Sequence, residues 1–336
     1  MRRTLRRYIV FVIMAAVLVA GAIFLRRVEL NTPKVPLGQG VESAVDWAII
    51  YLSPVLETIK LAISRVFMAM ETAFLWLPWP VWILLVGALG WRLASVRTGL
   101  LVAIALLVIW AVGLWSEAMS TLSLVGVAVI LTIVIAIPIG IIAARNDPFE
   151  NIIRPVLDGM QTIPSMVYLI PAVMLLGVGK VPAVFATMIF AVPPAIRLTN
   201  LGLRQVPQEV KEAARAFGAS AWQLLIKIEI PMALRTIMTG INQSTMMSVS
   251  MTVIAAFIGA GGLGYSVLFA LDRVRIGSGF EAGLAVLAIA IVLDRLTQAL
   301  AKPREPRQVK PPKQTKVEPA EEADVTTELA PFKIEP

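Results

Sequence analysis

Long apolar runs with almost no charged residues set the strongest limit on the fold of this 336-residue chain. A run of about 18 or more apolar residues is long enough to cross a bilayer as an α-helix. The chain is 58% hydrophobic and 15% charged, which leaves too little polar surface for a soluble domain of this length. The sequence therefore predicts an all-α, polytopic helical membrane protein. We expect about eight transmembrane helices, over residues 8–25, 73–91, 98–115, 118–143, 163–177, 181–200, 236–259 and 280–300.

The first apolar run, residues 8–25, follows a basic start and resembles a signal peptide. It is longer than the usual apolar core of such a peptide, and Arg26 and Arg27 follow it instead of a small-residue cleavage site. We expect it to be retained as a membrane helix. Residues 26–45 are predicted to form a loop. Residues 46–70 mix apolar and charged side chains, which indicates an amphipathic helix at the membrane surface or, as an alternative, a packed helix that does not span.

Composition divides the chain into three expected regions. Residues 1–115 carry the first membrane helices and the amphipathic helix, and residues 116–301 form the membrane core. Residues 302–336 are rich in Pro, Lys and Glu and have almost no apolar periodicity. They hold too few apolar groups to offset the entropy lost on ordering, so we expect a disordered cytoplasmic tail.

The basic residues indicate how the chain lies in the membrane. With the N-terminus inside, the cytoplasmic loops hold Arg145, Arg154 and the basic residues of segment 204–235, in agreement with the positive-inside bias. Arg273 and Arg275 would then lie outside, against that bias. The net charge of +8 is best explained by contact of these loops with anionic membrane lipid, and no soluble basic domain is present that would bind nucleic acid.

Several chemistries are excluded or disfavoured. The chain has no cysteine and no histidine, which excludes disulfides, Cys/His metal sites and Ser-His-Asp triads. Residues 259–264 match the dinucleotide pattern G-x-G-x-x-G but end an apolar span and follow no β-strand, so a bend or close helix packing explains them better. Residues 177–180 lack the spacing of a P-loop. We therefore expect no cofactor, no metal and no ATPase site on this chain.

The segment 204–231 is predicted to form a helix–turn–helix unit between two spans. Pro207 suits a helix start, and Val210, Ala213, Ala214 and Phe217 share one face. Gly218 suits the position after the helix end, where a positive φ favours glycine. A capping box is expected where Ser220 and Gln223 begin a second helix, and Pro231 is expected to end that helix before the next span.

The same segment resembles the EAA signature of ABC importer permeases. Glu212-Ala213-Ala214 is followed after three residues by Gly218, and after nine more by Ile228-Glu229-Ile230-Pro231, where Ile230 replaces the usual Leu. The resemblance implies the type I ABC importer (MetI-like) permease fold. It also implies a coupling helix that docks in a groove of a separate ATPase subunit, which hydrolyses the ATP. By position, Glu212 would make a polar contact, Ala213 and Ala214 would allow close packing, and Gly218 would form the turn; Phe217 and Pro231 complete the expected coupling unit.

Further stretches between Trp115 and Leu300 resemble the glycine betaine/proline betaine permeases, including Met160–Pro164, Val167–Pro171, Phe190–Thr199 and Leu293–Gln298. This resemblance implies import of a compatible solute across a bacterial inner membrane. It implies a permease homodimer, an ATPase subunit and an external solute-binding protein as partners. An ABC permease for choline, trimethylamine oxide or an amino acid is the alternative. A secondary transporter is disfavoured because no ionisable residue stands clearly at a span centre.

The span over 236–259 is unusually polar for a membrane helix. Polar side chains in a membrane usually face a bundle interior or a water-filled path. We expect this face to line the translocation path, with helix–helix hydrogen bonding as the equally weighted alternative. The candidate path residues are Asn242, Ser244, Thr245, Ser248 and Thr252.

Overall fold

The computed structural model describes residues 2–27 and 37–301, and every element in these ranges is helical. The longer helices are α1 (Arg2–Arg27), α2 (Leu37–Trp76), α3 (Trp79–Leu93), α4 (Val96–Ala111), α5 (Trp115–Arg145), α6 (Asp147–Thr162), α8 (Lys180–Arg204), α11 (Ile230–Ala255), α12 (Gly262–Asp272) and α13 (Ile276–Ala301). The shorter elements are η1 (Ser165–Tyr168), α7 (Leu169–Leu176), α9 (Gln208–Ala216), α10 (Ala221–Leu224), the π-helical turn η2 (Leu225–Glu229) and η3 (Ala256–Ile258). The predicted tail over 302–336 and part of the predicted loop lie outside the described residues.

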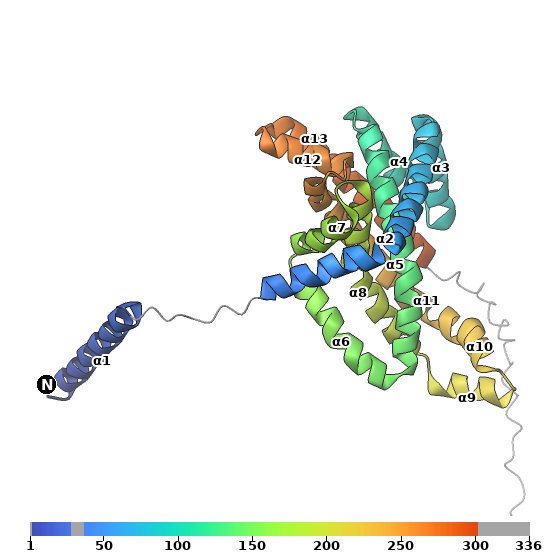
Figure 1. Ribbon diagram of the computed structural model, residues 1–336. Helices are drawn as coiled ribbons and strands as arrows, with labels where there is room; N and C mark the ends of the chain where they lie inside the picture. Colours follow the sequence, from blue (N-terminus) through green and yellow to red (C-terminus); the bar gives the residue numbers. More distant parts are fainter. Residues whose placement is uncertain (1, 28–36, 302–336) are drawn as a thin grey trace, which may run out of the picture.

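Helix α8 is the centre of the bundle, and most of its side chains are buried between α5 and α11. Glycines allow the helix backbones to approach closely, as is usual where helices pack in a membrane. A Cβ added to Gly240 of α11 would lie 2.9 Å from the Leu198 Cβ and 3.2 Å from the Pro194 carbonyl oxygen of α8. The close α8–α11 pair gives the bundle a rigid middle, from which the connecting segment α9–α10 extends (Figure 1).

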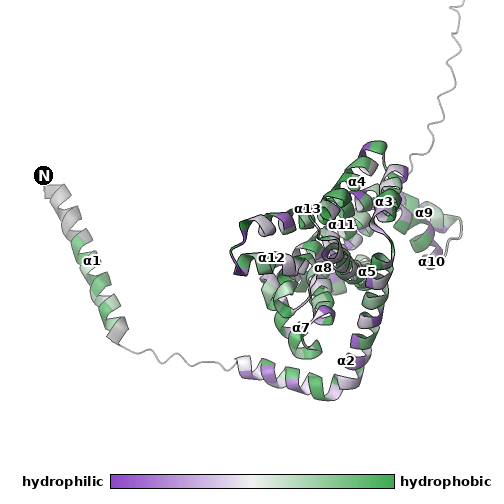
Figure 2. Ribbon diagram, turned by 90° about the horizontal axis from the view of Figure 1, so that it is seen from above, coloured by the Kyte–Doolittle hydropathy of each residue, from purple (hydrophilic) through white to green (hydrophobic). Residues whose placement is uncertain are grey.

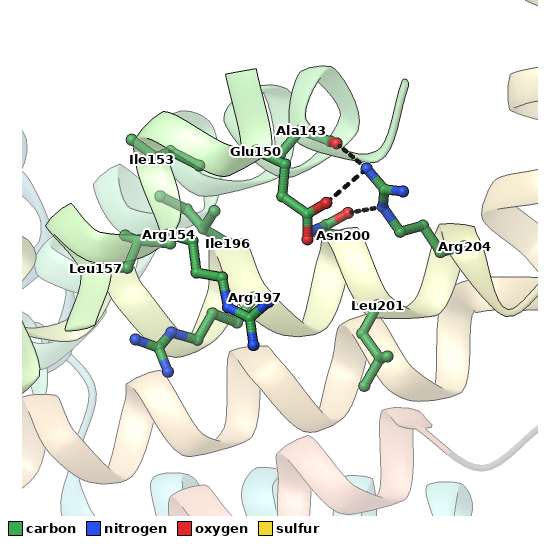
Figure 3. A pocket seen from close by; sticks show the side chains of 10 residues that line it. All are labelled: Ala143, Glu150, Ile153, Arg154, Leu157, Ile196, Arg197, Asn200, Leu201 and Arg204. Atoms are coloured by element: carbon green, nitrogen blue, oxygen red, sulfur yellow. Dashed lines mark hydrogen bonds and ion pairs between the residues drawn. The ribbon is translucent and has the colours of Figure 1, made fainter. Parts of the chain in front are cut away.

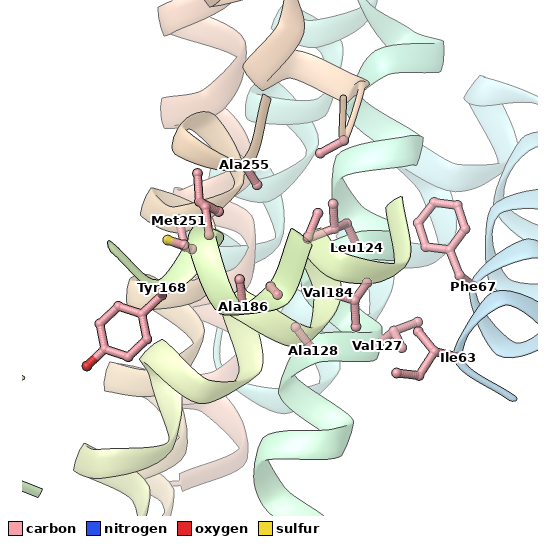
Figure 4. Close-up of a cluster of buried hydrophobic side chains, with 14 residues drawn as sticks. Ile63, Phe67, Leu124, Val127, Ala128, Tyr168, Val184, Ala186, Met251 and Ala255 are labelled. Atoms are coloured by element: carbon pink, nitrogen blue, oxygen red, sulfur yellow. The ribbon is translucent and has the colours of Figure 1, made fainter. Parts of the chain in front are cut away.

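A cluster of buried apolar side chains joins α2 to this centre. Ile63 and Phe67 of α2 pack near Leu124 and Val127 of α5 and Val184 of α8 (Figure 4). The Lys180 ammonium at the start of α8 lies 2.7 Å from a Glu71 carboxylate oxygen of α2 and 4.7 Å from the centre of the Phe67 ring. The second half of α2 is therefore part of the bundle core.

The structure corrects the bounds predicted around residues 37–76. The loop predicted over 26–45 ends earlier, since one 40-residue helix begins at Leu37 and runs through Pro54 to Trp76. The packing of its second half into the bundle favours the packed-helix alternative for that part of residues 46–70. Pro54 has no N–H to bond the Ile50 carbonyl, and the Ser53 hydroxyl donates to that carbonyl instead, at 3.3 Å. By length and composition α2 is able to cross a membrane. Figure 2 shows its first part reaching beyond the bundle, with hydrophilic and hydrophobic residues mixed along it.

The number of spans also differs from the expected eight. In the described ranges, α2, α5, α8 and α13 are long and apolar enough to cross a membrane, which makes four candidate spans, or up to six if two bent helix pairs count as one span each. The predicted spans over 73–91 and 98–115 are the shorter helices α3 and α4, of 15 and 16 residues. The predicted span over 163–177 is only the second arm of a bent helix pair, η1 and α7, which meets α6 at 110°. Residues 8–25 lie within α1.

Candidate functional site

Helix α9 forms where the sequence predicts it. Pro207 is the N-terminal capping residue, and its carbonyl accepts a hydrogen bond from the Lys211 N–H at 3.4 Å. Glu209 lies in the first turn and Arg215 in the last, which suits the helix dipole at each end. The Gln208 side chain donates to the Glu212 carboxylate at 3.1 Å, one turn along the helix. Helix α9 is thus supported by its own sequence, which a short helix that leaves the bundle requires.

The turn after α9 is a Schellman motif with glycine at the left-handed position. Gly218 has φ +82°, its N–H donates to the Arg215 carbonyl at 2.9 Å, and the Ala219 N–H donates to the Ala214 carbonyl at 3.0 Å. A capping box follows: the Gln223 N–H donates to the Ser220 hydroxyl at 3.3 Å, and the Ser220 N–H donates to the Gln223 side-chain oxygen at 2.9 Å. The predicted turn and second helix start are confirmed.

The tip of this α9–α10 unit is exposed and aromatic. Phe217 is 93% exposed and Trp222 is 68% exposed. Ala213 and Glu212 are exposed, and Val210 and Ala214 are half-buried. Phe217 and Trp222 are large apolar side chains that remain exposed, and small alanines lie close to both in the sequence. An exposed apolar surface of this kind suits contact with a partner protein. Figure 1 shows the unit at the opposite end of the bundle from the α12–α13 corner.

Pro231 does not end a helix, which corrects the prediction. The chain passes from α10 through the π-helical turn η2 directly into α11, and Pro231 lies in the first turn of α11. Because proline lacks an N–H, it breaks the regular pattern of hydrogen bonds at that point. The Ile230 N–H instead donates to the Leu225 carbonyl, five residues back. Helical backbone therefore connects the α9–α10 tip to the central helix α11 without a loop.

A polar clamp fixes the end of α8 four residues before α9 begins. The Arg204 guanidinium lies 2.7 Å from an Asp147 carboxylate oxygen and 2.8 Å from a Glu150 carboxylate oxygen, and it donates to the Ala143 carbonyl at 2.8 Å. Asn200 joins it by accepting from the Arg204 Nε at 2.9 Å and donating to Glu150 at 3.0 Å. These groups border a cavity of about 360 Å³ between α6 and α8 (Figure 3). The sequence indicated Arg204 only as a loop charge.

The five candidate path residues of α11 mostly face other helices. Ser244, Thr245, Ser248 and Thr252 are buried. The Ser244 hydroxyl donates to the Ala191 carbonyl of α8 at 2.7 Å, whereas the other three bond carbonyls of α11 itself. Asn242 is half-buried and donates to the Asp294 carboxylate of α13 at 3.1 Å. In this conformation the contacts favour the helix-packing alternative for the buried four.

A second polar face of α11 escaped the prediction. Thr239, Gln243 and Ser250 are exposed, at spacings of four and seven residues that place them on one stripe of the helix. The spacing can be read from the sequence, but the sequence does not show whether this stripe or the stripe of Ser244, Ser248 and Thr252 faces outward. Only the packing of α8 and α13 on the other side decides this.

The structure thus combines a bundle of helices able to cross a membrane, a helical unit that projects from one end and a polar outward stripe on α11. The chain belongs to the family described as "Binding-protein-dependent transport system inner membrane component", which it matches over residues 136–305. It is accordingly a multi-pass permease component of an ABC system in the inner membrane, and the ATPase is a different component.

Two relatives illustrate the likeness. The "Glycine betaine/proline betaine transport system permease protein ProW" of Escherichia coli (strain K12) is 43% identical over 268 residues, 80% of this chain and 76% of the relative. The "Glycine betaine/carnitine transport permease protein GbuB" of Listeria monocytogenes is 44% identical over 280 residues, 81% of this chain and 98% of the relative. A solved structure of the inward-facing MetNI methionine ABC transporter aligns with TM-score 0.49 and 22% identity, over 56% of this chain and 92% of that one.

Proposed function

We propose that this chain is the translocating subunit of a binding-protein-dependent ABC importer for a compatible solute such as glycine betaine or proline betaine. The observation that carries the proposal is the α9–α10 unit, a capped helix–turn–helix whose exposed tip leads through unbroken helix into α11. A separate ATPase subunit supplies the energy, and an external binding protein delivers the solute.

The residues of the α9–α10 unit take distinct roles in this proposal. Glu212 makes a polar contact with the ATPase, and the small Ala213 and Ala214 let its surface approach the helix. Phe217, 93% exposed, inserts into an apolar groove of the ATPase. Gly218 holds the turn that aims Phe217, and Pro231 with the π turn keeps the link to α11 helical.

The outward stripe of α11 is the proposed lining of the translocation path. A homodimer would place the Thr239, Gln243 and Ser250 stripes of two copies around a shared polar path, which would remove these polar groups from lipid. Asn242, through Asp294 of α13, and Ser244, through the Ala191 carbonyl of α8, hold α11 in the bundle with its stripe outward.

Cysteine labelling separates the two faces of α11, since the chain has no native cysteine. In the assembled complex, a soluble thiol reagent should label Ser250→Cys and leave Ser248→Cys, which replaces a fully buried side chain, unlabelled. Labelling should be followed with and without nucleotide. If Ser250→Cys stays unlabelled in both states, the stripe does not line a water-filled path. Labelling of Ser248→Cys would indicate that the buried face of α11 lines the path instead.

The solute assignment rests on what similar permeases are named for. Relatives that share 43–44% identity carry glycine betaine, proline betaine or carnitine in their names. A second candidate is trimethylamine oxide, because the "Trimethylamine N-oxide transport system permease protein TmoV" of Pelagibacter ubique is 42% identical over 225 residues, 31% of that relative. Glycine betaine and trimethylamine oxide each combine a positively charged methylated nitrogen with a negatively charged oxygen.

Uptake by proteoliposomes that contain the permease, its ATPase and its binding protein tests the function. Labelled glycine betaine should accumulate only with internal ATP and all three components. An excess of unlabelled proline betaine should reduce the rate more strongly than an equal excess of trimethylamine oxide. Accumulation without the ATPase would indicate a secondary transporter, and competition by trimethylamine oxide alone would favour the second candidate.

A further inference from the structure

Glu229 is a buried carboxylate at the junction between the α9–α10 unit and the bundle. Its residue is 7% exposed, and among residues 12–24 and 38–301 it is the one buried acidic or basic residue. Removing a charge from water costs several kcal/mol unless partners compensate for the lost hydration. A buried carboxylate at the base of a projecting helix therefore needs a structural or functional reason.

Two cations on different elements compensate this charge. The Arg145 guanidinium, at the end of α5, donates to Glu229 Oε2 at 2.9 Å. The Lys211 ammonium of α9 lies 3.8 Å from Glu229 Oε1 and donates to the Leu203 carbonyl of α8 at 3.3 Å. Arg145, Glu229 and Lys211, which we call the junction triad, thus connect the ends of α5 and α8, helix α9 and the turn η2.

The triad bridges a gap that the backbone crosses only by a longer route. Along the chain, α9 reaches α11 through the Gly218 turn, α10 and the π turn. Across space, Lys211 reaches Glu229 directly, one residue before α11 begins. A single π-helical turn inside helical backbone often marks a functional position, because its hydrogen bonds differ from those of the helix on either side. Here that turn carries the acidic member of the triad.

We infer that the junction triad is the joint through which a displacement of α9 is passed to α5, α8 and α11. Lys211 and Glu229 are positioning residues: they touch neither the solute nor ATP, and they hold α9 in a fixed relation to the central helices. Chains of ion pairs and rigid helices are a physical means of carrying such coupling. The inference rests on the proposed function, since it requires an ATPase docked on α9.

Lys211→Met tests the joint because methionine keeps much of the aliphatic volume and removes the charge. In proteoliposomes with the ATPase and the binding protein, ATP hydrolysis should stay within about twofold of the unmodified complex. The number of solute molecules imported per ATP should fall about fivefold, equal to about 1 kcal/mol of lost coupling. Lys211→Arg, which keeps the charge, should restore most of that ratio.

Lys180→Met is the matched control. It removes a shorter but more exposed ion pair, in which the Lys180 ammonium lies 2.7 Å from a Glu71 carboxylate oxygen, at the other end of α8. It should lower thermal stability and leave the ratio of import to hydrolysis unchanged. An unchanged ratio in Lys211→Met, an equal loss in Lys180→Met, or loss of the ATPase from the Lys211→Met complex would each overturn the inference. Failure of the unmodified complex to couple ATP to import would instead contradict the proposed function.

Discussion

Replacing Gly218 with valine is expected to abolish solute uptake while leaving membrane insertion intact. Gly218 has φ +82°, a conformation that costs a β-branched residue about 1–2 kcal/mol, so the Schellman turn would rearrange. The added Cβ meets nothing within 4 Å, which means that the effect comes from the backbone and not from a clash. The turn sets the direction of Phe217 and of α10, and the docking surface would be lost.

Glu212→Lys should have the same outcome through a different cause. The substitution reverses a charge on the exposed face of α9 and removes the partner of Gln208, without touching the bundle. Uptake by both variants in reconstituted vesicles should fall below about one hundredth of the unmodified rate, a loss of about 2.7 kcal/mol or more. The amount of each protein in the membrane should match the unmodified chain.

Gly113→Val is the matched control for the turn. Gly113 has φ +74° and, like Gly218, no atom within 4 Å of an added Cβ, but it joins α4 to α5 far from α9 in the sequence. It should carry a similar backbone cost and retain uptake. Normal uptake by both Gly218→Val and Glu212→Lys would refute the coupling assignment. An equal loss of uptake in Gly113→Val would show that backbone strain anywhere in the chain, and not the α9–α10 turn, causes the loss.

Gly264→Ala is expected to cause the largest loss of stability among single methyl additions. The added Cβ would lie 2.4 Å from the Thr252 carbonyl oxygen and 2.9 Å from the Val253 Cα, both backbone atoms of α11. Backbone cannot move aside as a flexible side chain can, so α12 must shift away from α11. Such overpacking typically costs about 1–3 kcal/mol. The melting temperature of the purified protein in detergent should fall by several degrees.

Gly283→Ala supplies the comparison for that measurement. Gly283 lies within α13, and nothing is within 4 Å of its added Cβ. Alanine favours helix over glycine by up to about 1 kcal/mol, so this variant should melt at the same temperature or higher. Equal melting temperatures for Gly264→Ala and Gly283→Ala would show that α11 and α12 do not meet as closely as the structure has them.

Local signals made the α9–α10 unit predictable before its structure. Gly218, Ser220 and Gln223 each act within a few residues, through a positive φ or through a capping box, so their spacing alone indicates the turn. The G-x-G-x-x-G stretch was equally readable. Gly264 serves the close helix packing that we predicted for that stretch, and no dinucleotide site needs to be invoked.

The membrane helices were less predictable because hydropathy records composition and not geometry. The chain bends by 110° at residues 163–164, between α6 and the η1–α7 segment, and hydropathy predicted only the second arm, as a complete span over 163–177. Conversely, α2 runs through Pro54, and the Ser53 hydroxyl bonds the carbonyl that the proline leaves free. Neither outcome follows from residue type alone, since both depend on what neighbouring groups supply.

The remaining parts of the site depend on tertiary contacts, which the sequence alone does not reveal. Glu229 lies at an unspecified position of the EAA signature, and its importance emerges only when Arg145, 84 residues away in sequence, lies beside it. The buried face of α11 was predicted to line a path because its hydroxyls are polar. Four of these side chains are buried, and their hydrogen bonds run to backbone carbonyls. Polar residues in a span satisfy either role, and the sequence does not choose between them.

Site-directed crosslinking from the tip of α9 tests the central claim most directly. Phe217→Cys places a thiol at a position that is 93% exposed, in a chain with no other cysteine, and Val274→Cys places one at an 81% exposed position between α12 and α13. With a photoactivatable thiol reagent on the assembled complex, Phe217→Cys should crosslink to the ATPase subunit, in a yield that changes with nucleotide. Val274→Cys should give no crosslink to the ATPase. Absence of the product from Phe217→Cys, or equal products from both sites, would contradict docking of the ATPase on the α9–α10 unit.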